Sequence, residues 1–190
     1  VTGVQTCALP IYNKSLSEIE EAIKLGVSRI VVDSIQEINR VQETASRLGK
    51  NQKVLIRITP GVEAHTHEAI STAHEDVKFG LSIATGAAWK AIELVEASSN
   101  LSLQGFHCHI GSQIFNTEGY EIAIKRIVEL NAKFKDSFNR ELSEFDIGGG
   151  FGIAYLPDET TMDPDAALAK LSKVIKTEFA NKKLALPKIS

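Results

Sequence analysis

Short runs of branched apolar residues alternate with longer segments of helical periodicity along this sequence, and this alternation limits the fold more than any other feature. The first two runs, RIVVD and VLIRI, are almost entirely apolar, as expected for strands covered on both faces. Strands separated by helical segments are typical of parallel sheets, so we expect an α/β protein. The expected strands are residues 29–33, 54–58, 103–109 and 144–147, with a further strand beginning within 186–190.

The helical segments carry recognisable start signals. Ser15 with Glu18, and Ser34 with Glu37, have the spacing of a capping box, in which both side chains bond backbone amides at the helix start. The last helical segment opens at an Asp-Pro pair, which places proline at its favoured first helical position. The expected helices are residues 15–26, 34–49, 84–98, 118–138 and 163–182.

Two architectures fit this alternation: a doubly wound sheet and part of a (β/α)8 barrel. A closed barrel takes about 250 residues, so a chain of 190 residues supplies a little over half of one. The connection over residues 60–80 is long for a strand-to-helix loop, and loops of that length tend to be functional or to pack at an interface.

Composition excludes several functional classes. The net charge of −3 gives no basic field for a polyanion, so nucleic acid is not an expected partner. No window reaches the ~18 to 20 consecutive apolar residues that cross a bilayer, and no secretory signal opens the chain. Cys7 and Cys108 are too few for a disulfide framework, which favours a cytoplasmic location.

The opening run, residues 1–11, has neither a strand period nor a helical one. It resembles read-through from a sequencing adapter, and a genuine disordered start is the alternative. We therefore expect residues 1–11 to be non-native and residues 12–190 to form the folded domain.

A glycine-rich segment, DIGGGFG, spans Asp146 to Gly152 at the end of an expected strand. Successive glycines let backbone amides converge on an anion such as phosphate. The segment has neither the lysine of a Walker loop nor the spacing of the dinucleotide fingerprint. Taken alone, it predicts either a phosphate site or an ordinary glycine-rich turn.

A histidine segment, GFHCHIGSQ, spans Gly105 to Gln113. On a strand, His107 and His109 share one face near its carboxyl end, where barrels of this type place their active sites. Two alternatives remain: a pair of hydrogen-bonded core histidines, and a zinc module, for which no third ligand has a convincing spacing.

Together the two segments resemble the pyridoxal-phosphate-dependent decarboxylases that act on diaminopimelate, ornithine and arginine. NKSLSEIEEAIKLGVSRIVVDS, VLIRITPGVEAHTHEAIST and DVKFGL extend the resemblance over nearly all of residues 12–190. The form HCHIGSQIF favours the diaminopimelate branch over ornithine decarboxylases, which usually have a shorter FHVGSG version.

The resemblance implies a fold and a reaction. It implies a partial (β/α)8 barrel that lacks the first strands, the last strand and a C-terminal β-domain. It implies pyridoxal 5′-phosphate as cofactor and, in a homodimeric parent enzyme, decarboxylation of meso-2,6-diaminopimelate to lysine. Arginine or carboxynorspermidine decarboxylation and a non-catalytic or racemase-like cofactor-binding barrel are the alternatives.

The resemblance also implies residue roles. His109 would stack on the cofactor ring, Ser112 would hydrogen-bond its phosphate, and the amides around Gly148, Gly149 and Gly150 would complete the phosphate site. An imidazole covers one face of the ring, and amides bind a dianion without a buried cation.

Two further residue roles follow from the same resemblance. Arg57 would lie near the cofactor, with a barrel-lining ion pair as the alternative, and Lys78 would lie at the dimer interface, with a solvated surface charge as the alternative. The family's Schiff-base lysine lies in a segment like YAVKAN that this chain lacks, and Lys14 should not be mistaken for it. No catalytic residue is therefore identifiable, and we expect the chain alone to be inactive.

Overall fold

A computed structural model of the chain describes residues 14–62, 79–154 and 161–190. Six strands in this part of the chain form one sheet, and all of its strand pairs are parallel. The order across the sheet is β1-β2-β4-β5-β6, and β3 pairs with the end of β2. The strands are β1 (Ile30–Val32), β2 (Gln52–Thr59), β3 (Leu81–Ser82), β4 (Leu101–Cys108), β5 (Glu144–Asp146) and β6 (Lys188–Ile189).

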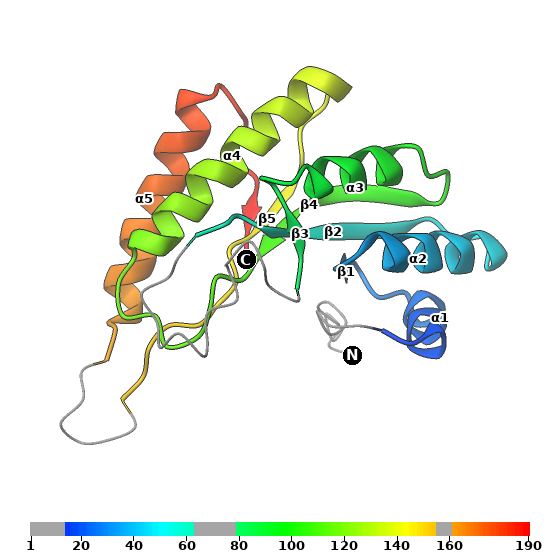
Figure 1. Ribbon diagram of the computed structural model, residues 1–190, viewed down its shortest axis with the longest axis horizontal. Coiled ribbons are helices and arrows are strands. Elements are labelled where there is room, and N and C mark those ends of the chain that lie inside the picture. The colour runs from blue at the N-terminus through cyan, green and yellow to red at the C-terminus, as the bar shows by residue number, and fades with distance from the viewer. Residues whose placement is uncertain (1–13, 63–78, 155–160) are drawn as a thin grey trace, which may run out of the picture.

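Helices α2, α3, α4 and α5 connect β1 to β2, β3 to β4, β4 to β5 and β5 to β6, and they cover one face of the sheet. Figure 1 shows α4 and α5 lying alongside each other, with α3 beside β4. Among the described residues, no helix combines the length and the apolar character needed to cross a membrane. The helices are α1 (Leu16–Leu25), α2 (Ile35–Arg47), α3 (Ala87–Glu96), α4 (Glu118–Phe138) and α5 (Pro164–Asn181).

The order of helices and strands predicted from the sequence is confirmed, and α4 has the predicted bounds. The sequence pattern missed β3, because Leu81–Ser82 is too short to show a period. The prediction that residues 1–11 are non-native falls outside the described residues.

The capping box predicted at α1 is confirmed, but the one predicted at α2 is wrong. The Ser34 hydroxyl accepts a hydrogen bond from the Glu37 amide, as expected. The Glu37 carboxylate, however, accepts from the Asp33 amide at 2.9 Å and pairs with the Lys14 ammonium at 3.0 Å. Glu37 and Lys14 are both almost fully buried, and a buried ammonium is a stronger partner for the carboxylate than the neutral Ser34 amide.

The two faces of the sheet differ in chemistry. Ile56 and Phe106 belong to the apolar core between the sheet and the helices. Because side chains alternate along a strand, the residues that follow them lie on the opposite face. Arg57, His107 and Asp146 are register partners on β2, β4 and β5, so they form a polar row across that inner face.

Gly105 marks a place where β4 and β5 approach too closely for a side chain. A Cβ added at Gly105 would lie 1.7 Å from the carbonyl oxygen of Glu144 on the neighbouring strand. We predict that Gly105→Ala lowers the free energy of unfolding by at least about 3 kcal/mol, the upper end of overpacking costs, because the clashing atom is backbone. Urea unfolding followed by circular dichroism measures the change.

Gly149→Ala is the matched control, because a Cβ at Gly149 meets nothing within 4 Å. It should leave stability unchanged or raise it by up to about 1 kcal/mol. A Gly105→Ala protein as stable as the control would show that β4 and β5 do not pair as described.

Candidate functional site

The histidine segment and the glycine segment meet at the carboxyl ends of β4 and β5. The Ile114 amide donates to the Gly150 carbonyl at 2.9 Å, and the Gly152 amide donates to the Ile114 carbonyl at 2.8 Å. Ile114 and Phe151 thereby form a parallel bridge beyond the two strands. Two motifs far apart in the sequence thus form one structural unit.

Glycine is required at two positions of this unit. Gly148 has φ +71°, and a Cβ there would lie 2.2 Å from the Cys108 carbonyl oxygen. Gly150 has φ +107°, and a Cβ there would lie 2.0 Å from the Gly111 carbonyl oxygen. Both conformations favour glycine, and both contacts are with backbone that cannot move aside. The glycine turn therefore lies flat against the segment that follows β4.

Two amides of the turn remain available for an anion. The Gly148 amide donates to the Asp146 carboxylate at 2.9 Å, so it already has an acceptor. Within the described part of the chain, no hydrogen bond uses the Gly149 or Gly150 amide, and the space beside Gly149 is open. Ser112 lies close to the turn, because its Cα is 3.3 Å from the Cβ position at Gly150. Backbone amides and a hydroxyl can together hold a phosphate.

His107 lies on the inner face and is only 2% exposed. Burial, followed by the nearby charges of Arg57 and His109, lowers the pKa of His107 to about 3. Burial and then Arg57 also lower the pKa of the partly buried His109. Both imidazoles are therefore neutral near pH 7. In the described residues, the Nδ1 atom of His107 has no hydrogen-bond partner.

The Arg57 side chain on the inner face lies near Asp33 and near the residues just before β3. Its guanidinium lies 4.0 Å from the Asp33 carboxylate and 5.1 Å from the centre of the Phe79 ring. Asp33 also accepts a hydrogen bond from the Gly80 amide, while burial raises the pKa of its carboxyl. Arg57 therefore has contacts consistent with the barrel-lining ion pair, in addition to its position beside His107.

Lys14 lies in a buried ion pair. Its ammonium contacts the Glu37 carboxylate at 3.0 Å and donates to the Val31 carbonyl at 2.8 Å. An ammonium held by two acceptors and almost wholly buried is a structural group. This geometry agrees with the expectation that Lys14 does not form the cofactor's Schiff base.

Some of the predicted features fall outside the described residues. Lys78, the predicted dimer-interface residue, is one of them. In the parts of the chain that are described, no group of three or more His, Cys, Asp or Glu side chains could hold a metal ion.

Comparison with known proteins decides the family. The family described as pyridoxal-dependent decarboxylase, pyridoxal binding domain, matches residues 9–189. The chain belongs to this family. The predicted family and its cofactor, pyridoxal phosphate, are thereby confirmed.

Curated relatives refine the placement within the family. The diaminopimelate decarboxylase of Mycobacterium leprae is 48% identical over 181 residues, which are 93% of this chain and 38% of the relative. That of Bacillus subtilis is 38% identical over 177 residues, 93% of this chain and 40% of the relative. The chain thus spans about 40% of the length of the relatives it matches.

Solved structures confirm the fold as part of a (β/α)8 barrel. Diaminopimelate decarboxylase from M. jannaschii, in co-complex with L-lysine, superposes with a TM-score of 0.82 at 30% identity and covers 93% of this chain and 40% of that one. The Helicobacter pylori enzyme, complexed with L-lysine, superposes with a TM-score of 0.80 at 30% identity. The match covers 93% of this chain and 42% of that one.

Sequence reasoning missed Tyr120, which lies in the first turn of α4 and is 1% exposed. Its hydroxyl donates to the Gly149 carbonyl at 2.9 Å, and its ring lies 5.4 Å from that of Phe151. In the sequence it appears as one more apolar position of a helix, and only the pairing of β4 with β5 brings it to the glycine turn.

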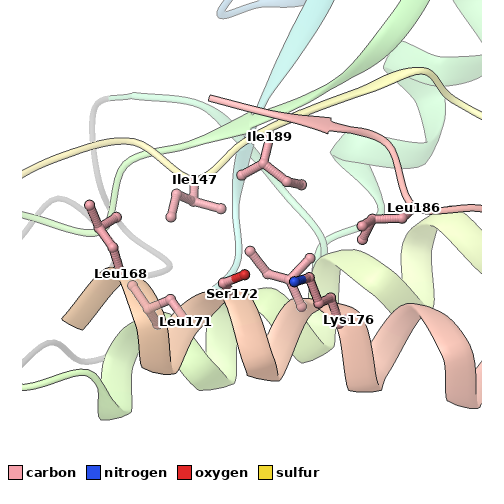
Figure 2. Close-up of a pocket in the computed structure, with 8 residues that line it drawn as sticks. Ile147, Leu168, Leu171, Ser172, Lys176, Leu186 and Ile189 are labelled. Carbon is pink, nitrogen blue, oxygen red and sulfur yellow. The ribbon is translucent and has the colours of Figure 1, made fainter. Parts of the chain in front are cut away.

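An apolar groove of about 230 Å³ lies elsewhere, between α5 and the strands β5 and β6. Figure 2 shows Leu171, Ser172 and Lys176 of α5 facing Ile147 and Ile189. Ile147 belongs to the helix-side core, so this groove opens on the face of the sheet opposite His107. It is separate from the candidate site.

The depressed pKa of His107 predicts a pH-dependent stability. The folded-state pKa of about 3 lies below the ordinary 6.5, so protonation favours the unfolded chain. Full stability is present above pH 6.5 and is lost as pH falls toward 3, at up to about 1.4 kcal/mol per pH unit. His107→Asn cannot take up this proton, so its stability should depend less steeply on pH.

Urea unfolding of both proteins between pH 7 and 4 measures this difference. Other acidic titrations, such as that of Glu20, occur in both proteins and cancel. Equal pH slopes for the wild-type chain and the variant would contradict the burial of a neutral imidazole at this position.

Proposed function

We propose that this chain forms the cofactor-binding part of an enzyme that decarboxylates meso-2,6-diaminopimelate to L-lysine. The observation that carries the proposal is the joining of the histidine and glycine segments into one site with two available amides. The substrate is supported by relatives named diaminopimelate decarboxylase and by two similar structures that hold L-lysine.

The residues of the site fit pyridoxal phosphate. The Gly149 and Gly150 amides have no acceptor among the described residues, and the Ser112 Cα lies 3.3 Å from the Cβ position at Gly150. A dianion held in this way needs no buried cation, and the Arg57 guanidinium is engaged with Asp33 and Phe79. The Gly148 amide is not assigned to the phosphate, because it donates to the Asp146 carboxylate. Gly148 instead helps to set the conformation of the turn.

When bound, pyridoxal phosphate supplies an electron sink for the bond that breaks as carbon dioxide leaves. The chain's own residues position and shield that chemistry. His109, neutral because burial and Arg57 lower its pKa, offers a flat face for stacking. His107, two residues earlier on the same strand, is buried and neutral and adds no charge to the site.

We propose that Lys14, whose ammonium is paired with the Glu37 carboxylate, does not form the Schiff base, and that the 190-residue chain alone is inactive. We further propose that the parent is a cytoplasmic homodimer with Lys78 at its interface, on the strength of the family resemblance and the scarcity of cysteine.

Arginine or carboxynorspermidine decarboxylation is the nearest alternative, and a non-catalytic cofactor-binding barrel is a second. A zinc module using His107 and His109 is the third, and it is weakened because the described residues contain no group of three or more His, Cys, Asp or Glu side chains that could hold a metal ion.

A substrate panel on the full-length parent enzyme tests the proposed function. Purified enzyme loaded with pyridoxal phosphate is given meso-2,6-diaminopimelate, arginine, ornithine or carboxynorspermidine, and carbon dioxide release is measured. We expect release with diaminopimelate at least about 100-fold faster than with the others, since a site built for a second polar group discriminates by that much or more.

Gly150→Ala in the parent is the loss-of-site control. It should lose its cofactor on dialysis, because the added Cβ displaces the turn from Gly111. Preference for arginine or carboxynorspermidine would overturn the substrate, and a parent that holds no pyridoxal phosphate would overturn the function.

A further inference from the structure

Contacts within the glycine turn do not by themselves fix the direction of every peptide in it. Glycine adopts positive and negative φ with similar ease, so the peptide between two glycines can flip. Gly148 and Gly150 are fixed by backbone contacts on either side, at Cys108 and Gly111. Gly149, between them, meets nothing within 4 Å at its Cβ position, so no contact there fixes the direction of the Gly149–Gly150 peptide.

The direction of this peptide decides whether the site attracts or repels an anion. The bond is trans, so the Gly149 carbonyl and the Gly150 amide point in opposite directions. If the amide faces the open space, it can donate to an anion there. If the peptide flips, a carbonyl oxygen faces the same space and repels the anion.

The Gly149 carbonyl shows the direction of this peptide, and Tyr120 contacts it. Its hydroxyl donates to the Gly149 carbonyl at 2.9 Å from the side of α4. The Gly150 amide therefore points away from α4, where no described residue accepts from it. Burial raises the pKa of the Tyr120 phenol, so it keeps the proton that it donates.

The tyrosine is itself held firmly. It is 1% exposed, and the centre of its ring lies 5.4 Å from the centre of the Phe151 ring. Phe151 is the residue that forms the parallel bridge with Ile114. A buried ring in the first turn of a 21-residue helix has little conformational freedom. The Tyr120 hydroxyl therefore has a fixed position relative to the glycine turn.

We propose that Tyr120 is a positioning residue for the phosphate site, whose hydroxyl holds the Gly149–Gly150 peptide with its amide toward the bound phosphate. The inference rests on the proposed function, because it assumes that the anion is the cofactor's phosphate. Tyr120 acts through the backbone and does not itself touch the cofactor. Its removal changes affinity for the phosphate group and leaves the ring-binding residues as they are.

The test compares Tyr120→Phe with wild type in the cofactor-free full-length enzyme. Pyridoxine 5′-phosphate and pyridoxine are the probes, since neither has the aldehyde that would react with lysines. Isothermal titration calorimetry gives both affinities. We expect Tyr120→Phe to weaken pyridoxine 5′-phosphate binding roughly 3- to 10-fold, as the loss of one hydrogen bond does, while pyridoxine binding changes less than about twofold.

Phe134→Leu is the control for a merely structural effect. Phe134 is a buried ring on the same helix, packed against Phe138 and away from the glycine turn. It should lower the melting temperature without changing the ratio of the two affinities.

Three outcomes are distinct. A lowered ratio in Tyr120→Phe alone supports the proposal. An unchanged ratio in Tyr120→Phe, with wild type still preferring the phosphorylated probe, overturns it and leaves the proposed function standing. A wild-type enzyme that does not prefer the phosphorylated probe overturns the phosphate site itself, and the proposal with it.

Discussion

The close backbone contact between the glycine turn and the end of β4 is the constraint on which the site depends. Gly148 lies against the Cys108 carbonyl and Gly150 against the Gly111 carbonyl, at separations that admit no side chain. This contact fixes the turn relative to His109 and Ser112, whichever ligand the site holds. Parallel pairing of β4 with β5 brings the two segments to the same edge of the sheet, as active sites of such barrels require.

The inner face of the sheet explains why polar residues interrupt otherwise apolar strands. Arg57, His107 and Asp146 lie in one row, and Arg29 pairs with Glu144 at 2.8 Å in the row below. Charges in such a place must be paired or neutralised, and burial keeps His107 neutral. The same strands therefore supply an apolar core toward the helices and a polar lining toward the site.

The alternation of strands and helices and the two central motifs could be predicted from the sequence because each depends on local patterns, whereas the choice of a barrel over a doubly wound sheet came from the family resemblance. Helix α4 follows from its periodicity, and the glycine turn from its composition. The partners of Glu37 could not be predicted, since its capping position gives no sign of the buried Lys14 ammonium. Tyr120 was missed for a similar reason, because a contact between a helix and a distant turn leaves no mark in either segment.

We propose that the Gly149 and Gly150 amides bind the cofactor's phosphate. Amide spectra of the chain labelled with ¹⁵N-glycine, recorded during titration with pyridoxine 5′-phosphate, test this binding. We expect that the Gly149 and Gly150 signals shift, that those of Gly26 and Gly49 at distant helix ends do not, and that pyridoxine shifts none of them. Unmoved Gly149 and Gly150 signals at saturation, or equal shifts with pyridoxine, would contradict it.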